Sequence, residues 1–388
     1  MAEPRFAPLN YRQTGFLPLA VVSVFLAVAG VGAALYMESY GHIVTGMSNR
    51  IVWGLPHVFA VMLIVAASGA LNLASLSSVL GKYDFKPLAR LSGLSALALL
   101  SGGLAVLVLD LGRPDRLFIT LFHRNLKSVF AWNIYLYSGF FAIVGAYLFV
   151  MMDRNISKNP IWTKRLGTLA FVWRLILTTG TGSIFGFLIA RELYDSAILA
   201  PLLIASSLQL GLAFKLVLLA ALGRLESVDK GHFRRLLILF LLTTLALLII
   251  LHVTKLYAAA HVPSESFLLW NGGGYSLIFW LGQVGLGLVL PLVLLFASGS
   301  RPALLLASGA LLLGGIAQFY TLIIAGQAWP LTIFPGMNVS SSFYDGQIIW
   351  YSPSVVEVLL GLGGVGIALT LVLLGMLVLP ILPKEEAA

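Results

Sequence analysis

The stretch GLPHVFAVMLIVAASGALNLASLSSV (residues 54–79) decides the fold class. It contains no Asp, Glu, Lys or Arg, and it exceeds the roughly 20 residues that an α-helix needs to cross a ~30 Å hydrocarbon core. Nearly every other hydrophobic run in the chain is also long enough to cross a bilayer. These runs lack the two-residue alternation of outer-membrane strands. We therefore expect an all-α integral membrane protein.

The composition points the same way. Of the 388 residues, 59% are hydrophobic and 10% are charged, whereas a soluble domain carries roughly 25% charged residues. The chain has no cysteine, so it can form neither a disulfide nor a thiolate-ligated iron–sulfur cluster of its own. The basic residues behind the net charge of +9 lie in short loops between apolar runs, so we expect no nucleic-acid binding.

The hydrophobic runs predict about ten transmembrane helices in a single polytopic domain. A polar start followed by a run of full helix length argues against a cleaved signal peptide. We expect spans two to five and six to nine to form two four-helix bundles, with the first and tenth spans as two additional helices. The predicted spans lie near residues 16–37, 54–79, 88–109, 129–152, 166–190, 197–222, 234–256, 276–297, 302–327 and 355–380.

The distribution of positive charge predicts the sidedness. An even number of spans puts both termini on one side, and the loops on that side carry about twice as many Lys and Arg residues as the opposite loops. We therefore expect cytoplasmic termini in the inner membrane. The longer connections 110–128, 257–275 and 328–354 then face outward. The last two are rich in Trp, Tyr, Pro and Gly, which suits structured caps that could dock a partner.

Polar residues inside the predicted spans are the candidates for function, because an ionisable group in hydrocarbon is costly. His57 begins the second span, Asp110 ends the third, and His252 lies near the end of the seventh. Under the predicted topology all three fall in the outer third of the membrane. The other polar residues at this level are Asn133, Tyr135, Arg191, Glu192, Lys255, Gln318, Tyr320 and Glu357. We predict that this group lines one pocket near the outer surface.

Such a pocket suits a quinone, whose ring packs on apolar walls while its two oxygens need hydrogen-bond partners that can exchange protons. Histidine and carboxylate groups can do this because burial shifts their pKa values toward neutrality. The predicted roles are hydrogen bonds to the quinone for His57 and Tyr135, a lining for Trp53 and Asn133, proton relay for Asp110 and His252, and extension of that relay for Glu357 and Gln318.

Structural alternatives remain for these residues. Asp110 and Arg113 could form an ion pair that fixes a loop, and a single buried histidine is often a hydrogen-bonded packing residue. Deeper in the membrane, Arg174 and Lys215 could belong to a proton path, or they could snorkel or pair locally. A haem b between His57 and His252 is also possible. We favour a chain without a bound haem, because one histidine pair is thin evidence.

Several segments resemble the NrfD/PsrC family of quinone-interacting membrane subunits. They include WGLPHVFAVMLIVAASGA (53–70), LDLGRPDRLF (109–118), KSVFAWNIYLYSG (127–139) and TGSIFGFLIARELYDSAILAPLLIASSLQLGLA (181–213). The segments IIAGQAWPLTIFPG (323–336) and YSPSVVEVLLGLGG (351–364) look most like the DsrP branch, which belongs to the Dsr electron-transport complexes of dissimilatory sulfur metabolism. The resemblance covers essentially the whole chain.

This resemblance implies two four-helix bundles and a quinone site near the outer face. His57 matches the quinone-site histidine of the family, and Tyr135 occupies a plausible place for its tyrosine. The implied partners are a periplasmic four-cluster iron–sulfur protein similar to DsrO, a multihaem cytochrome c, and further membrane and cytoplasmic subunits of a Dsr-type complex. Members generally carry no cofactor of their own, so the quinone or quinol is expected as substrate.

Two other functions remain open at this point. A secondary transporter or ion channel usually binds its substrate near the bilayer midplane on broken helices. Here the polar groups cluster outward, and Pro291 is the main proline inside a span. A non-catalytic anchor for a redox complex would have no requirement for His57. Binding of a quinone analogue distinguishes the leading hypothesis from both.

Overall fold

A computed structural model describes residues 6–123, 125–153, 155–156, 160–227, 229–331 and 346–383. The part of the chain that it describes contains ten helices long and apolar enough to cross a membrane. This confirms the predicted all-α membrane fold. Of the basic residues used to predict sidedness, Arg5, Arg124, Arg154, Lys158 and Lys384 lie outside the described residues, as does the middle of the 328–354 connection.

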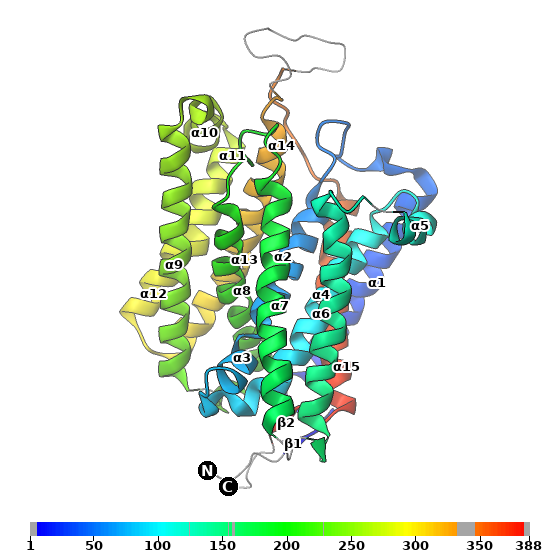
Figure 1. Ribbon diagram of the computed structural model, residues 1–388, viewed down its shortest axis with the longest axis vertical. Coiled ribbons are helices and arrows are strands. Elements are labelled where there is room, and N and C mark those ends of the chain that lie inside the picture. The colour runs from blue at the N-terminus through cyan, green and yellow to red at the C-terminus, as the bar shows by residue number, and fades with distance from the viewer. Residues whose placement is uncertain are drawn as a thin grey trace.

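The spanning helices form the two predicted bundles with two additional helices (Figure 1). The first bundle contains α2 (Leu55–Ala70) with α3 (Asn72–Ser78), η2 (Tyr83–Leu88) with α4 (Ala89–Leu109), α6 (Val129–Met152) and α7 (Pro160–Gly186). The second contains α8 (Leu199–Ala221), α9 (Lys230–Tyr257), α11 (Gly274–Leu277) with η8 (Ile278–Val289) and α12 (Leu290–Ala297), and α13 (Arg301–Tyr320) with η9 (Thr321–Ala325) and α14 (Gly326–Ala328). The additional helices are α1 (Phe16–Tyr40) and α15 (Val355–Val378).

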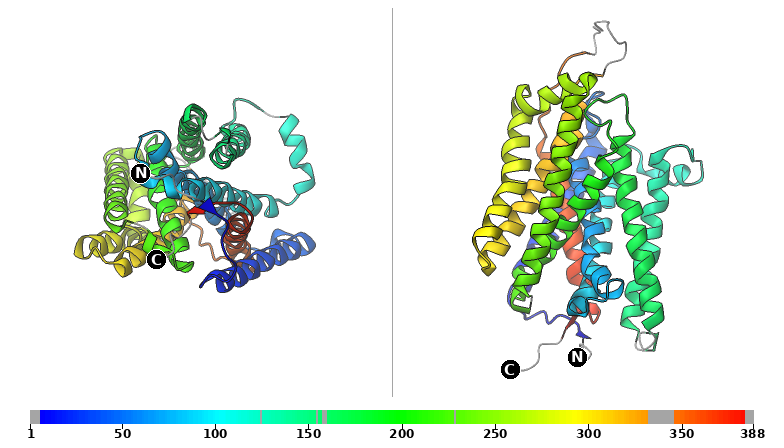
Figure 2. Two further views of the ribbon diagram at one scale, coloured as in Figure 1. Left: turned by 90° about the horizontal axis from the view of Figure 1, so that it is seen from below. Right: turned by 60° about the vertical axis from the view of Figure 1, so that its left-hand side comes forward.

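Short elements connect these helices. They are β1 (Phe6–Ala7), η1 (His42–Val44), η3 (Pro114–Arg116), α5 (Leu117–Phe122), η5 (Leu225–Ser227), η6 (Ala259–His261), α10 (Val262–Ser266), η7 (Phe267–Asn271) and β2 (Leu382–Pro383). Helix α5 lies apart from the packed helices in both views of Figure 2. β1 pairs with β2 in an antiparallel ladder that joins the two ends of the chain. We call the opposite end of the molecule, at the top of Figure 1, the distal end.

Local sequence explains where the helices begin and end. Asp229 caps α9 by accepting from two backbone N–H groups, Ser300 caps α13 by accepting from one, and Ser354 opens α15 with a capping box. α7 begins at Pro160, whose fixed φ suits a first helical turn. It therefore starts earlier than the predicted 166–190 span and ends at Gly186, so Arg191 lies in the following loop.

Close glycine contacts join the helices. A Cβ atom at Gly69 on α2 would lie 1.6 Å from the carbonyl oxygen of Ser207 on α8, and one at Gly211 would lie 2.1 Å from the carbonyl carbon of Gly69. α1 and α15 cross in the same way at Gly30 and Gly363, where each added Cβ would lie 2.5 Å from the other glycine's Cα. Small residues let membrane helices approach closely and gain dispersion contacts. The α2–α8 crossing therefore holds the two bundles together.

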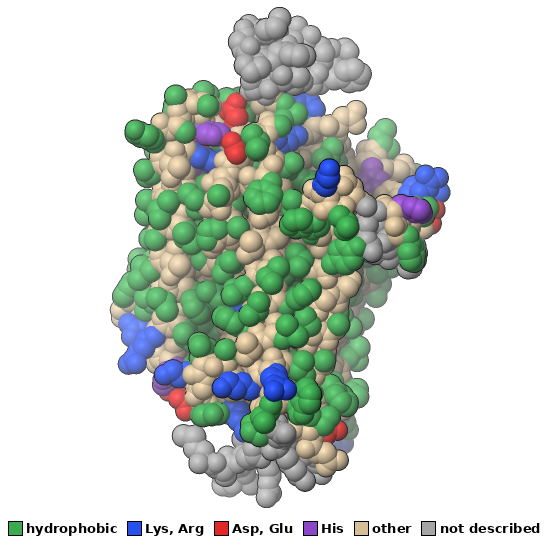
Figure 3. Space-filling view, in the orientation of Figure 1, with side chains coloured by type: hydrophobic (Ala, Val, Ile, Leu, Met, Phe, Trp, Pro, Cys, Tyr) green, Lys and Arg blue, Asp and Glu red, His purple; other side chains and the backbone are tan. Residues whose placement is uncertain are grey.

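The surface suits a bilayer. α2 is almost wholly buried, whereas α1, α9 and α12 turn much of their apolar surface outward. On the face shown in Figure 3, hydrophobic side chains cover the middle and charged side chains gather toward the two ends. This is the arrangement expected of a protein whose central band contacts lipid.

The α2–α8 crossing gives a first test. Gly69→Ala and Gly211→Ala place a methyl group inside backbone atoms, so each should lower the free energy of unfolding by about 1–3 kcal/mol through overpacking. Thermal unfolding of the purified protein in detergent measures the change. Gly309→Ala on α13 is the matched control, because a Cβ there meets no heavy atom within 4 Å. Equal unfolding midpoints for all three variants would contradict the assigned packing.

Candidate functional site

His57 and Asp110 meet at the distal end of the first bundle. Gly54 is the N-cap of α2, so His57 lies in the first turn of that helix, and Asp110 is the C-cap of α4, which packs against α2. His57 Nδ1 lies 3.1 Å from Asp110 Oδ2, and the Asp110 side chain is almost fully buried. The two predicted site residues are therefore adjacent although they come from different helices.

A second histidine, His42, completes this group. Its Nε2 lies 2.8 Å from the Asp110 carbonyl oxygen and 3.8 Å from Asp110 Oδ1. Because a carbonyl can only accept, Nε2 carries the proton of this hydrogen bond. His42 belongs to η1 and its side chain is partly exposed. Sequence reasoning missed it, because a histidine in a loop between spans carries no pattern that marks it as functional.

An aromatic wall stands beside His57. The ring centroids of Trp53 and His57 are 6.4 Å apart, and those of Trp53 and Phe185 are 5.8 Å apart in an edge-to-face arrangement. Phe130 at the start of α6 lies 5.8 Å from Trp53 by the same measure. The wall therefore joins the beginning of α2 to α6 and α7. Flat apolar surface next to an imidazole is the combination predicted for a quinone site.

Asn133 lies on the face of α6 that carries Phe130, because residues three apart are neighbours on a helix. Its Nδ2 donates to the Val129 carbonyl, and its buried Oδ1 has no hydrogen-bond partner among the described residues. Tyr135 is two residues further and points to roughly the opposite face, with 39% of its surface exposed. Asn133 Oδ1 thus lies beside α7, 3.7 Å from where a Cβ at Gly180 would be, whereas Tyr135 lies about 200° further around α6.

Gln327 holds the Trp53 segment in place. Its Oε1 accepts from the backbone N–H groups of Val52 and Trp53, both at 3.0 Å, and its Nε2 donates to the Trp53 carbonyl at 2.9 Å. Arg191 donates to the Gln327 carbonyl at 3.2 Å. Burial lowers the pKa of Arg191 from its ordinary value, with repulsion from Arg50 acting in the same direction. The sequence did not predict these hydrogen bonds between Gln327 and the Trp53 segment, because the two lie far apart along the chain.

Glu357 has structural contacts at both carboxylate oxygens. Oε2 accepts from the backbone N–H groups of Gly46 and Ser354 at 2.7 and 2.8 Å, and Oε1 accepts from the Tyr351 hydroxyl at 2.5 Å. The same hydroxyl accepts from the backbone N–H of Leu55 at 2.8 Å. Burial and the bond to Glu357 raise the pKa of Tyr351. Tyr351 and Glu357 therefore tie the start of α2 to the start of α15.

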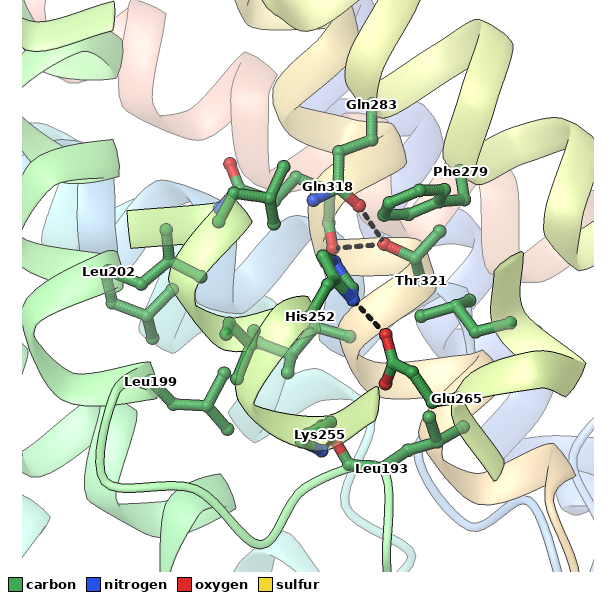
Figure 4. Close-up of a pocket in the computed structure, with 15 residues that line it drawn as sticks. Leu193, Leu199, Leu202, His252, Lys255, Glu265, Phe279, Gln283, Gln318 and Thr321 are labelled. Atoms are coloured by element: carbon green, nitrogen blue, oxygen red, sulfur yellow. Dashed lines mark hydrogen bonds and ion pairs between the residues drawn. The ribbon is translucent and has the colours of Figure 1, made fainter. Parts of the chain in front are cut away.

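His252 and Gln318 lie in a different place, a cavity of about 40 Å³ inside the second bundle (Figure 4). His252 Nδ1 pairs with Glu265 Oε1, and Gln318 Nε2 donates to Ser206 Oγ at 2.7 Å. The residues that line this cavity include neither His57 nor Asp110. The predicted polar residues therefore form two groups, one in each bundle, instead of one pocket.

Arg174 and Lys215 donate hydrogen bonds to backbone carbonyls at the point where α2 is interrupted. α2 ends at Ala70 and α3 starts at Asn72, so carbonyls near the break lose their helical partners. Arg174 Nη1 donates to the Ser68 carbonyl at 3.0 Å, and Lys215 Nζ donates to the Ala70 carbonyl at 2.7 Å. These contacts favour local pairing over a proton path for both residues, because each charge stabilises a helix end.

The geometry also bears on metals and haem. Among the described residues, no group of three or more His, Cys, Asp and Glu side chains could hold a metal ion. The two histidines of the haem alternative, His57 and His252, lie in separate bundles, and each faces its own carboxylate. The site that remains is a histidine–carboxylate pair beside an aromatic wall, which can bind and exchange a proton with an organic ligand.

A protein-family model described as polysulphide reductase, NrfD, matches residues 43–330 of this sequence. The chain belongs to the NrfD family. The match begins at η1 and ends after α14. It therefore includes both bundles and the residues Trp53, His57, Asp110 and Asn133, but not His42.

Two of three named relatives cover nearly the whole chain, and the third covers 72% of it. The NrfD-family chain is 27% identical over 376 residues to the Hdr-like menaquinol oxidoreductase integral membrane subunit of Archaeoglobus fulgidus, covering 94% of each sequence. It is 25% identical to a subunit of the selenate reductase of Mesobacillus selenatarsenatis, covering 93% of each sequence. It is also 25% identical to a chain of the polysulfide reductase of Wolinella succinogenes, covering 72% of this sequence and 96% of the relative.

The Tyr351 contacts give a second test. Tyr351→Phe leaves the Leu55 N–H and Glu357 Oε1 without their partner, which should destabilise the NrfD-family chain by about 1–3 kcal/mol. The unfolding midpoint in detergent measures this. Tyr257→Phe is the matched control, because Tyr257 is 93% exposed and should change the midpoint little. A loss of the same size in both variants would refute the role given to Tyr351.

Proposed function

We propose that this chain is the quinone- or quinol-binding membrane subunit of a respiratory-type redox complex, with its site at the distal end of the first bundle. The observation that carries the proposal is the His57–Asp110 pair beside the Trp53 wall. Membership of the NrfD family supports it, and so does a relative named as a menaquinol oxidoreductase subunit over almost the full length.

His57 is the proposed contact for one quinone oxygen. Its Nδ1 faces Asp110, and no described residue bonds to its Nε2, which leaves that nitrogen for the ligand. Asn133 is the proposed contact for the second oxygen, because its unpartnered Oδ1 can accept from a quinol hydroxyl. Trp53 supplies the apolar wall for the ring. Tyr135, expected from the sequence to bind the quinone, is the weaker candidate because it lies on the face of α6 opposite to Asn133 and is 39% exposed.

The same residues account for the protons. Oxidation of one quinol to quinone releases two electrons and two protons. His57 takes one hydroxyl proton at Nε2, and the Asp110 carboxylate stabilises the imidazolium that forms. After His57 has released this proton to water at the distal end, it takes the second hydroxyl proton in the same way. The two electrons leave by tunnelling to a redox centre in the partner, since the chain has no cysteine for a cluster of its own. Reduction of a quinone runs the same steps in reverse.

We propose cytoplasmic termini, so that the distal end faces outward from the inner membrane. The excess of Lys and Arg in the loops on the side of the termini supports this orientation. Aromatic side chains gather at the distal end, where Trp350 stacks on Tyr275 at 5.4 Å and Trp270 on Trp280 at 5.9 Å. Trp350 and Trp270 are largely exposed, as expected of residues at an interface.

The proposed partner at this end is an iron–sulfur protein of the four-cluster type. The sequence resemblance to the DsrP branch makes a DsrO-like protein and a multihaem cytochrome c the specific candidates, and dissimilatory sulfur metabolism the proposed setting. The relatives named above belong to selenate, polysulfide and menaquinol systems. We therefore expect the partner subunits, and not this chain, to determine the terminal electron donor or acceptor.

Binding of a menaquinone analogue to the purified chain tests the proposal. His57→Ala should weaken binding about 10- to 100-fold, as expected for loss of a hydrogen bond to a charged group. Asn133→Leu should weaken binding more than Tyr135→Phe. His232→Ala is the matched control, because His232 pairs with Asp229 at the end near the termini. Unchanged binding in the His57 and Asn133 variants would contradict the proposal and favour a non-catalytic anchor.

A further inference from the structure

The second bundle contains an ionisable group that quinone binding does not use. Glu265 in α10 has a side chain that is 1% exposed, and it pairs with His252 of α9. Lys255, one helical turn after His252, is also buried and donates to the carbonyls of Glu192 and Leu193. A carboxylate, an imidazole and an ammonium group buried together need a functional or a pairing explanation.

Part of this group lacks partners. Glu265 Oε2 and His252 Nε2 are buried and make no hydrogen bond with any described residue. Both residues line the 40 Å³ cavity, together with Gln283, Gln318 and Thr321 (Figure 4). A cavity needs about 10–15 Å³ by this measure to hold one water molecule, so there is room for about three. Water bound here would satisfy both orphaned atoms.

A second cavity continues this one toward the middle of the membrane. It has a volume of about 10 Å³ and shares Leu248, Gln283 and Gln318 with the first. Its other polar lining residues are Gln209 and Thr244, and Gln209 Oε1 is again buried without a partner among the described residues. Gln209 is ten residues into α8, or about 15 Å at 1.5 Å per residue. The row of polar residues that line the two cavities, from Glu265 to Gln209, thus ends near the bilayer midplane.

The backbone around the cavities is unusual. The described chain has three π-helical segments, η7, η8 and η9. All three contribute lining residues to the first cavity, and Thr321 of η9 donates to Gln283 of η8 at 2.5 Å. π-Helical turns are rare and occur often at functional sites. Here they turn polar side chains inward in helices whose other faces meet lipid.

Ionisable groups also lead from the first cavity to the distal surface. His261 pairs with Asp195 at 3.4 Å, and both are partly exposed. Glu265 attracts the Lys255 ammonium group electrostatically, and Asp195 and Glu192 add to this attraction. Lys255 is thus the charged group that interacts directly with Glu265, and Asp195 and Glu192 interact with Lys255 in turn. His261 is linked to this group through Asp195.

We propose that the second bundle forms a half-channel for protons, open to the distal side and ending near Gln209, with the Glu265–His252 pair as its proton-binding site. A proton enters from distal water, passes through cavity water and binds Glu265 Oε2, while His252 Nδ1 shares the Oε1 side. The amide and hydroxyl side chains orient the water and exchange no protons themselves. This site is separate from the His57 group and does not depend on quinone binding.

Infrared difference spectroscopy of the full chain in lipid nanodiscs, between acidic and alkaline pH, tests the proton site. The wild type should show a carboxyl signal that shifts in deuterium oxide, and Glu265→Gln should lose it. Asp229→Asn is the matched control, because Asp229 is an exposed carboxylate at the opposite end of α9. A spectrum unchanged by Glu265→Gln would overturn the proposal. Quinone-analogue binding by Glu265→Gln, expected to match the wild type, keeps this result apart from a failure of the proposed function.

Hydroxyl-radical footprinting of the unmodified chain tests the hydration and needs no variant that might fail to fold. Bound water should give oxidative labelling of His252 and Phe279, which line the first cavity. Phe140, fully buried in the first bundle, should stay unlabelled. Gln318→Leu, which replaces a polar lining residue by an apolar one of similar size, should reduce the labelling of Phe279. Labelling of His252 and Phe279 no greater than that of Phe140 would show a dry cavity and overturn the half-channel.

Discussion

Hydrocarbon offers no hydrogen bonds, so each polar group inside the membrane must find a partner within the chain. This constraint explains much of the structure. At the break in α2 after Ala70, backbone carbonyls accept hydrogen bonds from the charged side chains of Arg174 and Lys215. In the segment before α2, backbone groups of Val52 and Trp53 form hydrogen bonds with the Gln327 side chain. Two cations that look functional in the sequence thus stabilise the irregular backbone of the most buried helix.

The exceptions to this rule identify the candidate sites. Most of the buried side-chain atoms without a described partner fall in two regions. One is the distal end of the first bundle, with atoms of His57, Asp110 and Asn133. The other is the line through the second bundle, with atoms of Gln209, His252, Glu265 and His261. In the first region, Asn133 Oδ1 is the atom that we expect the organic ligand to reach, whereas the orphaned Nδ1 of His57 faces Asp110. In the second region we expect water to complete the hydrogen bonds.

The sequence predicted the fold well because transmembrane helices are defined by length and hydropathy, which are local properties. The ten spans follow from them, whereas the two-bundle arrangement was implied by the resemblance to the NrfD/PsrC family. The pairing of His57 with Asp110 could also be predicted from the sequence, because His57 begins one span and Asp110 ends another at the same end of the molecule. The grouping of all polar residues into one pocket was not, because hydropathy gives the depth of a residue but not its direction around the helix axis. The direction around the helix axis puts His252 and Gln318 in a separate cavity. It also puts Tyr135, which is partly exposed, on the face of α6 opposite to Asn133.

Other features depended on contacts between distant parts of the chain. His42 and Gln327 reach the His57 group from a loop and from the last helix of the second bundle, and neither has a local sequence signature. Glu265 lies in a short helix of the connection 257–275 between two spans, where a carboxylate normally meets water. Only the fold shows that it turns back into the bundle and pairs with His252.

Photolabelling with a quinone that carries a photoreactive group tests the central claim most directly, because it separates the two regions in one experiment. We expect covalent label on peptides that contain Trp53 and His57 at the start of α2, or Asn133 at the start of α6. Excess unlabelled quinone should suppress this label. Label concentrated instead on peptides of α9, η8 or η9 around His252, Phe279 and Thr321 would place the quinone in the second bundle and rule out the site beside His57.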